Sequence, residues 1–376
     1  MGGNALKEVN TKRLNREEFE LVKNDVINTL QKFFPEARIE AIPAYSSKSS
    51  FGDLDILISE HVVEEYKAKE KENKYMSEIN PLGLLMERLF NGKQSIENDT
   101  VLSFDYRFNP KDEYGFQVDL IYTQDKYFDF AKNYFSYNDL GNLIGRVAAA
   151  MGLKFGHQGL VYSVKHESNN FALVEISNDF YKSLDFLGFS VEEHKKGFHD
   201  LNEIFKYVST SKYFNPDIYK LENRSYKERV RDRKRPTYRA FLAYSKKLEE
   251  THNSFYQFPD KKEWLPTLFN TFPGFQSNWN KAWKYYDNKK NAKILFNGTT
   301  VGSLVNLEHK YLGHFMNHVR SKFTSPQEFY SWIVEQKKED LNSFILKCLV
   351  EFDTFKQDIN IEEPTKNLLK FKKIKM

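Results

Sequence analysis

Hydrophobic and polar positions follow two different spacings along the chain. In residues 15–34, hydrophobic side chains recur every three or four positions after Asn15, a residue type that commonly caps helices, and this pattern predicts a helix. Shorter stretches rich in branched and aromatic residues, bounded by turn-forming residues, predict strands. The pattern indicates strands at 37–43, 53–59, 101–108 and around Asp119, a turn at 109–112, a short helix at 81–90 and a charge-rich, solvated insertion at 60–79.

The order of these elements predicts the fold class. Two strands, a helical excursion and two more strands favour a mixed sheet with helices on one side, so we expect an α+β domain over residues 1–125. Residues 126–235 are expected to form a second domain of helices with a hairpin at about 160–176. Residues 236–376 are expected to form a third, mostly helical domain.

Three carboxylates lie on two of the expected strands. Asp53 and Asp55 are two positions apart, so their side chains share one face of a strand, while Leu54 and Ile56 face the opposite layer. Asp119 lies in a similar hydrophobic run. If the two strands are neighbours, the three charges come close together and require cations or raised pKa values. Ligand oxygens alone favour Mg²⁺, with Mn²⁺ as the alternative.

A polar loop precedes the first two carboxylates. Residues 45–50 read Tyr-Ser-Ser-Lys-Ser-Ser, and a glycine follows that lets the backbone approach a ligand closely. Hydroxyls, backbone N–H groups and one ammonium can hold the outer phosphates of a triphosphate. The candidate nucleotide-binding residues of this segment are Ser46, Ser47, Lys48, Ser49 and Gly52.

These residues resemble those of the nucleotidyltransferase superfamily typified by DNA polymerase β, and in particular the family X polymerases. The loop and strand of that family end in Ser-Ser-Gly-Asp-x-Asp, and a later strand carries Val-Asp-Leu; the similar positions here are Ser49, Ser50, Gly52, Asp53, Asp55 and residues 118–120. A Tyr-Phe pair, an Asn, an Arg-containing helix and a glycine-rich run follow in the family. Here these are similar to Tyr134-Phe135, Asn138 or Asn142, Arg146 and residues 151–160.

The resemblance covers about residues 35–215. It implies a palm over residues 1–125, a thumb-like domain over 126–235 and nucleotide-binding roles for Tyr134, Phe135, Asn138 and Arg146. The chain also departs from the family: Ile42-Pro43-Ala44 stand in place of Gly-Ser, Tyr45 and a serine replace paired arginines, and Tyr137 replaces a glycine. Only about forty residues precede the loop, so we expect no lyase or hairpin module.

The triad and the resemblance together imply a two-metal nucleotidyl transfer. Asp53 and Asp55 would bind the ion that bridges the triphosphate of an NTP or dNTP. All three carboxylates would share a second ion, about 3.5–4 Å from the first, that lowers the pKa of the attacking hydroxyl. Asp119 is the candidate general base. The expected acceptor is the 3′-hydroxyl of DNA or RNA, and templated and untemplated addition both remain open.

Charge distribution bears on the acceptor. The net charge is only +4, but residues 224–247 concentrate arginine and lysine among the aromatic residues Tyr226, Tyr238, Phe241 and Tyr244. Such a segment can neutralise phosphates and stack on bases, although a solvated helix face is the alternative. The candidate nucleic-acid-binding residues are Arg229, Arg231, Arg233, Lys234, Arg235 and Arg239. A second basic cluster, from Lys366 to Lys375, is expected to be a frayed tail.

Several other classes are disfavoured. The single cysteine, Cys348, excludes an intramolecular disulfide and a thiolate zinc finger. No hydrophobic stretch approaches the ~18 residues that span a bilayer, and signal-peptide, myristoylation, P-loop and dinucleotide-binding patterns are absent, so we expect a cytoplasmic protein with no membrane partner. Spacing gives no metal role to His157, His166, Asp105, Asp125 or Asp129.

Two alternative functions remain. One is a nucleotidyltransferase that modifies a protein, a tRNA or a small molecule, as toxins and resistance enzymes of this superfamily do. The other is a non-catalytic nucleic-acid-binding module, which the presence of all three carboxylates disfavours. The residues do not predict an oligomeric state.

Overall fold

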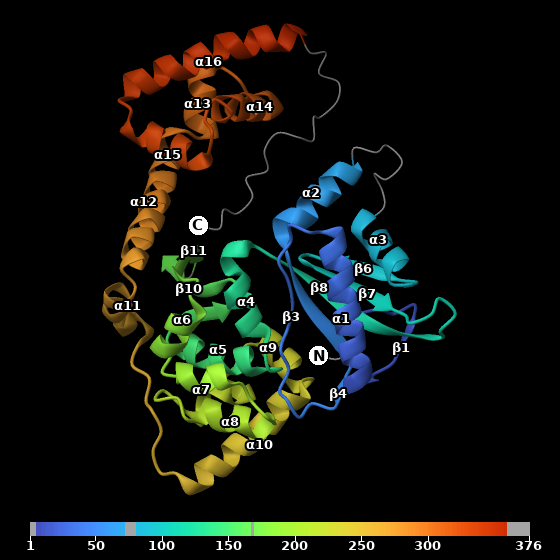
Figure 1. Cartoon of the computed structure of the whole chain (residues 1–376). Coiled ribbons are helices and arrows are strands. Elements are labelled where there is room, and N and C mark those ends of the chain that lie inside the picture. The colour runs from blue at the N-terminus through green and yellow to red at the C-terminus, as the bar shows by residue number, and fades with distance from the viewer. Residues whose placement is uncertain (1–4, 72–79, 167–168, 359–376) are drawn as a thin grey trace. The chain divides into compact units, whose positions relative to one another are not determined.

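The computed structural model describes residues 5–71, 80–166 and 169–358 (Figure 1). Contacts divide the chain into two compact units. Unit 1 comprises Met1–Tyr162 and Glu175–Phe272, and unit 2 comprises Ser163–Val174 and Pro273–Met376. The expected boundaries at 125 and 235 both fall inside unit 1. The basic cluster from Lys366 to Lys375 and residues 72–79 of the expected insertion lie outside the described residues.

Unit 1 is built on a mixed sheet. Its strands lie in the order β3 (Ile39–Ala41), β5 (Asp53–Ser59), β8 (Tyr114–Thr123), β7 (Val101–Tyr106) and β6 (Ser95–Asn98), and β1 (Asn10–Thr11) also pairs with β8. β5 and β8 run parallel, whereas β3 with β5, β7 with β8 and β6 with β7 are antiparallel. The parallel pair is possible because helices, instead of a tight turn, connect β5 to the later strands.

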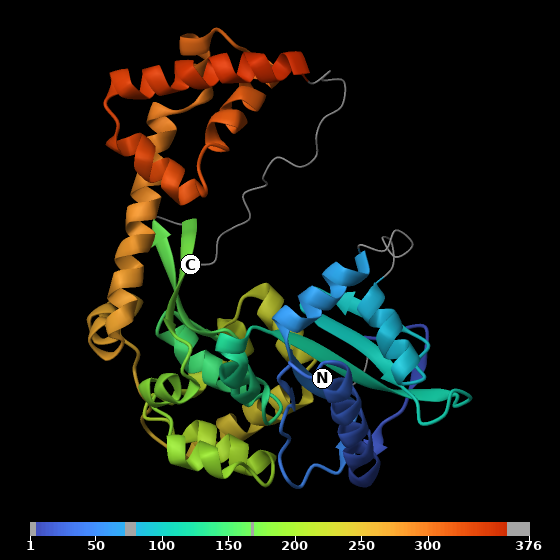
Figure 2. The same ribbon diagram turned by 45° about the horizontal axis from the view of Figure 1, so that its top comes forward.

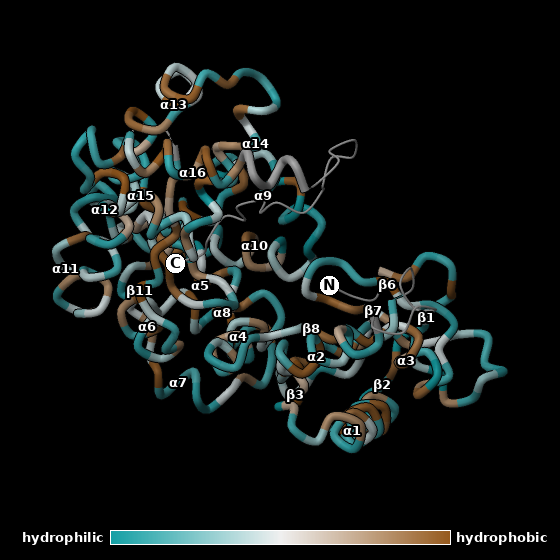
Figure 3. Tube along the Cα trace, turned by 90° about the horizontal axis from the view of Figure 1, so that it is seen from above, coloured by the Kyte–Doolittle hydropathy of each residue, from teal (hydrophilic) through white to brown (hydrophobic). Residues whose placement is uncertain are grey.

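One face of this sheet is covered by α1 (Arg16–Phe33), α2 (Glu60–Lys71) and α3 (Pro81–Leu89). The side chain of Asn15 accepts a hydrogen bond from the backbone of Glu18, whose side chain caps Asn15 in return, so α1 begins where the sequence predicts. Hydrophobic and hydrophilic residues alternate around α1 in Figure 3. Burial of Val22, Val26 and Leu30 against the sheet contributes about 1.5–3 kcal/mol each.

The opposite face of the sheet is covered in part by α4 (Phe128–Phe135). Phe128 and Ala131 pack on Leu57 of β5 and Ile121 of β8. The expectation of helices on one side only is therefore wrong, because alternate residues of the central strands are hydrophobic on both faces. Leu57 and Ile121 share their face with the carboxylates, so α4 packs on this face next to the carboxylates.

The first half of the expected insertion is solvated over most of its length, but it forms a helix that also packs on the sheet. Glu60–Lys71 forms helix α2, in which Val63 is fully buried in the core of the sheet and Tyr66 packs edge-on against Phe34. The charged residues of this segment obscured a narrow hydrophobic stripe at helical spacing.

Unit 1 also contains a two-stranded sheet, a three-stranded sheet and further helices. Their elements are β4 (Ser50–Phe51), paired with β2 (Leu14–Asn15), then α5 (Leu140–Ala150), β9 (Leu153–Gly156), β10 (Gly159–His166), β11 (Asn169–Ser177), α6 (Phe180–Phe186), α7 (Val191–Lys196), α8 (Leu201–Ser209), α9 (Tyr226–Arg233), α10 (Pro236–Thr251) and α11 (Leu265–Thr271). The hairpin expected at 160–176 is present as β10 and β11, whose outer ends belong to unit 2. Phe130 of α4, Phe155 of β9 and Phe180 of α6 pack together in an aromatic cluster.

In the described residues of unit 2, the regular elements outside the hairpin are helices. Unit 2 contains α12 (Pro273–Leu295), α13 (Gly298–Val305), α14 (His309–Arg320), α15 (Pro326–Glu335) and α16 (Lys338–Asp358), and Figure 2 shows α13 to α16, orange to red, gathered together. Phe315, Phe329, Ile345 and Cys348 are buried in its core. The expected α+β class with a mixed sheet and a helical C-terminal region is thus confirmed. Within the described ranges, no helix is both long and hydrophobic enough to cross a membrane.

Candidate active site

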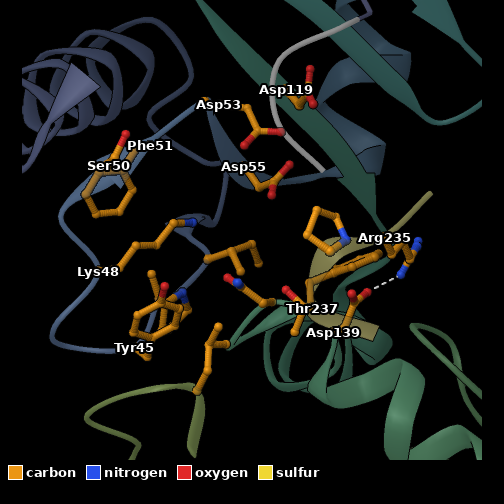
Figure 4. Close-up of a pocket in the computed structure, with 18 of the residues that line it drawn as sticks. Tyr45, Lys48, Ser50, Phe51, Asp53, Asp55, Asp119, Asp139, Arg235 and Thr237 are labelled. Carbon is orange, nitrogen blue, oxygen red and sulfur yellow. Dashed lines mark hydrogen bonds and ion pairs between the residues drawn. The ribbon is translucent and has the colours of Figure 1, made fainter. Parts of the chain in front are cut away.

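The three carboxylates predicted as metal ligands come together in unit 1. Asp55 on β5 lies directly opposite Asp119 on β8, and Asp53 lies opposite Gln117. One ligand oxygen from each of Asp53, Asp55 and Asp119 lies within 4.8 Å of the others. Figure 4 shows the three side chains gathered at the strand pair. The prediction that the two strands are neighbours and that Asp53 and Asp55 share a face is confirmed.

Burial and mutual repulsion perturb these carboxyl groups. Burial, followed by the charges of Asp53 and Asp119, raises the pKa of Asp55 to about 7. Burial also raises the pKa of Asp119, although hydrogen bonds from Ser103 and Gln117 oppose the rise. The Gln117 amide donates to both oxygens of Asp119, at 2.9 and 3.0 Å. The cluster therefore carries unfavourable negative charge that a divalent cation would neutralise.

The other acidic residues near this sheet have structural partners. Asp105 is fully buried, accepts hydrogen bonds from the backbone N–H groups of Lys93 and Gln94 at 2.8 Å, and pairs with Arg107 at 2.7 Å. Asp125 accepts a hydrogen bond from Ser59, and Asp129 pairs with Arg38. Each of these three acids thus has a hydrogen-bond or ion-pair partner within the protein. In the described part of the chain, the triad is the group with metal-ligating geometry.

A cavity of about 550 Å³ opens at the triad. Its wall includes five of the nine residues predicted to bind the nucleotide. Lys48 and Gly52 lie beside the triad, and Tyr134, Phe135 and Asn138 lie where α4 ends and α5 begins. Burial lowers the pKa of Lys48, while the nearby charges of Asp53 and Asp55 act to raise it. The Lys48 ammonium therefore lies close enough to Asp53 and Asp55 to interact electrostatically with both carboxylates.

Four predicted nucleotide-binding residues do not line this cavity: Ser46, Ser47, Ser49 and Arg146. The backbone N–H groups of Ser46 and Ser47 donate to the carbonyl oxygens of Phe198 and His199, at 3.0 and 2.9 Å. The Ser46 hydroxyl lies 3.0 Å from Nδ1 of His199. Arg146 is buried, and its guanidinium pairs with Glu228 at 3.1 Å.

Three charged residues of the cavity wall were not foreseen as parts of the nucleotide site. Arg13 lies just before β2, and pairing of β2 with β4 brings it beside Ser50. Asp139 and Arg235 form an ion pair on another side of the cavity (Figure 4). Arg235 was assigned to a nucleic-acid surface from its charged neighbours. No local pattern marks Arg13, because its position depends on strand pairing with a distant segment.

The turn between α4 and α5 has an unusual backbone. Tyr137 and Asn138 have φ angles of 61° and 63°, in the left-handed region that a bulky residue rarely adopts. Tyr137 stands at the position where the sequence comparison with family X polymerases expects a glycine. Its N–H donates to the carbonyl of Pro43 at 3.0 Å, and its ring packs edge-on against Phe198. These contacts hold the turn so that Asn138 and Asp139 face the cavity.

The basic segment is only partly at the surface. Arg231 pairs with Asp232 and donates to Asn142, both at 3.1 Å, and Arg235 pairs with Asp139. Tyr238 and Phe241 are fully buried, so they offer no faces for base stacking, contrary to expectation. Of the predicted cations, Arg231, Arg233, Lys234 and Arg239 are exposed, Arg229 and Arg235 are half-buried, and Arg231 is exposed despite its ion pair.

Comparison with known proteins adds no family to this description. No model of a protein family matches the chain, and no curated protein matches it. Any functional conclusion therefore depends on the geometry of the triad and its cavity.

Proposed function

We propose that this protein is a metal-dependent nucleotidyltransferase. The observation that carries the proposal is the set of three carboxylates on two parallel strands, with ligand oxygens within 4.8 Å of one another at the wall of a cavity. A volume of about 550 Å³ is in the range of small-molecule sites and suits one NTP or dNTP. Lys48, beside the triad, provides a positive charge for the outer phosphates.

The donor set fits Mg²⁺ or Mn²⁺. Asp53, Asp55 and Asp119 supply only carboxylate oxygens, and a bound cation would relieve the repulsion that helps to raise the pKa of Asp55. One or two such ions would stabilise the charge on the transferred phosphoryl group and lower the pKa of the attacking hydroxyl.

The side chains of the cavity have roles that follow from their places. The Asp119 carboxylate, whose pKa is raised by burial, accepts the proton of the acceptor hydroxyl. The hydroxyl oxygen forms a bond to the α-phosphorus, the bond from that phosphorus to the bridging oxygen breaks, and diphosphate leaves. Tyr134, Phe135 and Asn138 contact the nucleoside, and Lys48 contacts the outer phosphates.

A nucleic-acid 3′-hydroxyl is the acceptor that we propose first. The exposed Arg233, Lys234 and Arg239 support it, because cations at a surface bind a phosphate backbone. A protein, tRNA or small-molecule acceptor is the second candidate. It is favoured by the ion pair that holds the half-buried Arg235 against Asp139 and by the burial of Tyr238 and Phe241, which reduce the area available to a nucleic acid.

A transfer assay tests the proposal. Each labelled NTP and dNTP is offered with Mg²⁺ or Mn²⁺ to DNA, RNA, tRNA and protein acceptors together, using wild type, Asp53→Asn, Asp119→Asn and the control Asp99→Asn, whose carboxylate is exposed. We expect transfer by wild type and the control, and at least a hundredfold loss in both triad variants. Turnover within a few-fold of wild type in the triad variants would refute the assignment. Nucleic-acid binding without any transfer would favour the non-catalytic module.

A further inference from the structure

The phosphate-binding groups of the cavity differ from those that the loop sequence indicates. The N–H groups of Ser46 and Ser47 and the hydroxyl of Ser46 are used in contacts with Phe198 and His199. These groups hold the loop in place and are therefore not available to a ligand. Of the four loop residues predicted to hold phosphates, Lys48 alone lines the cavity.

A second cation reaches the same part of the cavity from a different segment. Arg13 Nε donates to the Ser50 hydroxyl at 2.8 Å, and its Nη2 donates to the Ser50 carbonyl at 2.9 Å. Ser50 and the neighbouring Phe51 and Gly52 line the cavity directly before Asp53. The Lys48 ammonium lies over the Phe51 ring, 4.9 Å from its centroid, so both cations lie at the short strand β4 that leads into the triad.

The backbone of the Lys48 loop is held by a third cation. Arg16, the first residue of α1, donates from Nη2 to the carbonyl oxygens of Ser46 at 2.9 Å and Lys48 at 2.6 Å. Its guanidinium also lies over the Phe51 ring, 5.2 Å from the centroid. Arg16 does not line the cavity. It can act on a ligand only by fixing the backbone from which the Lys48 side chain extends.

We propose that Arg13 is a second triphosphate-binding residue beside Lys48, and that Arg16 is a positioning residue for Lys48. This inference rests on the proposed nucleotidyl transfer, and it defines the ligand as a linear polyphosphate ester. The β- and γ-phosphates of such a ligand carry negative charge that the three carboxylates repel. Arg13 and Lys48, which line the cavity together with residues 50–52, provide the charge-assisted hydrogen bonds that hold these phosphates.

Inorganic tripolyphosphate is the probe, because it lacks a base. Its affinity is measured by calorimetry with full-length protein and Mn²⁺, and Mn²⁺ affinity is measured alone by electron paramagnetic resonance. In Arg13→Gln, Lys48→Gln and Arg16→Gln we expect tripolyphosphate affinity to fall about 10- to 100-fold. Mn²⁺ affinity should stay within about threefold of wild type, whereas a general folding defect would weaken both. The control Lys32→Gln removes an exposed charge at the opposite end of α1 from Arg16 and should change neither affinity.

Arg16 has a further readout. Loss of its carbonyl contacts should increase hydrogen exchange at residues 45–49 without changing exchange in β8, and Arg16→Lys should restore part of the tripolyphosphate affinity. Wild-type affinity in the Arg13 and Lys48 variants, no binding of tripolyphosphate by wild type, or an equal loss in Ser47→Ala would overturn the inference. If binding depends on Arg13 and Lys48 but no nucleotide is transferred, the proposed function fails while this inference stands.

Discussion

Replacement of Asp55 by Asn should stabilise the metal-free protein, and more so at high pH. Burial and two neighbouring carboxylates raise the pKa of Asp55 to about 7 in the folded state, whereas its unfolded value is near 3.9. The folded state therefore binds more protons than the unfolded state at intermediate pH. Ionisation of Asp55 opposes folding, so the free energy of unfolding falls as pH rises from about 4 to about 7.

The two pKa values determine the size of the effect. Ionisation of Asp55 costs about 4 kcal/mol at pH 8 and about 1–2 kcal/mol at pH 5, since one pKa unit corresponds to roughly 1.4 kcal/mol. Asn carries no charge at either pH. Asp55→Asn should thus be more stable than wild type by about 2–4 kcal/mol at pH 8, and this advantage should shrink by about 2 kcal/mol at pH 5.

Hydrogen exchange in EDTA provides the measurement, because it separates the two units. Peptides from β5 and β8 report on unit 1, and peptides from α16 serve as an internal reference from unit 2. Asp99→Asn is the matched control, since Asp99 is an exposed acid at φ 56°, a conformation that Asn tolerates. Added Mn²⁺ should stabilise wild type more than the variant. A variant that is less stable than wild type at pH 8, or an advantage that does not change with pH, would refute the reasoning.

Three further predictions concern other parts of unit 1. Burial lowers the pKa of His194 to about 4, so folded protein should lose up to about 3 kcal/mol as pH falls from 6.5 to 4; urea denaturation should show that His194→Phe abolishes this loss. A Cβ at Gly141 would lie 2.1 Å from the carbonyl oxygen of Tyr134, so Gly141→Ala should destabilise by about 1–3 kcal/mol and weaken nucleotide binding. Gly145→Ala, in the same helix with its nearest atom at 3.6 Å, should instead stabilise by about 0.5–1 kcal/mol in thermal denaturation. Arg233→Gln should make the slope of log K against log salt shallower by about 0.7–0.9 if nucleic acid binds there, and an unchanged slope would indicate a solvated helix face.

Sequence reasoning succeeded where the relevant pattern is local. Alternation along a strand places Asp53 and Asp55 on one face and Leu54 and Ile56 on the other, and the structure has this arrangement. The cap at Asn15 is local in the same way. The register that sets Asp55 opposite Asp119 could not be read from either strand alone, although the two hydrophobic runs suggested that the strands were neighbours.

The remaining errors concern partners that lie far along the chain. A serine-rich loop has the same sequence whether its N–H groups face a phosphate or, as at Ser46, the carbonyl of Phe198. Arg231 and Arg235 belong to a charge run typical of a solvated surface. In the structure, Arg231 donates to Asn142 of α5, and Arg235 pairs with Asp139, the residue before α5. Such side-chain pairing depends on tertiary packing that spacing along one helix does not encode.

The parallel pairing of β5 with β8 has a consequence for synthesis and folding. Asp53 and Asp55 leave the ribosome before α2, α3, β6 and β7, and Asp119 follows only after these elements. A nascent chain with β5 alone has two carboxylates and no enclosed site, so it should hold a divalent cation weakly. Contacts between such distant segments form late because closing the intervening loop costs entropy. Tight binding of a cation at the proposed site should therefore appear in one step, when β8 inserts between β5 and β7. The onset of cation binding would then mark the completion of the central sheet.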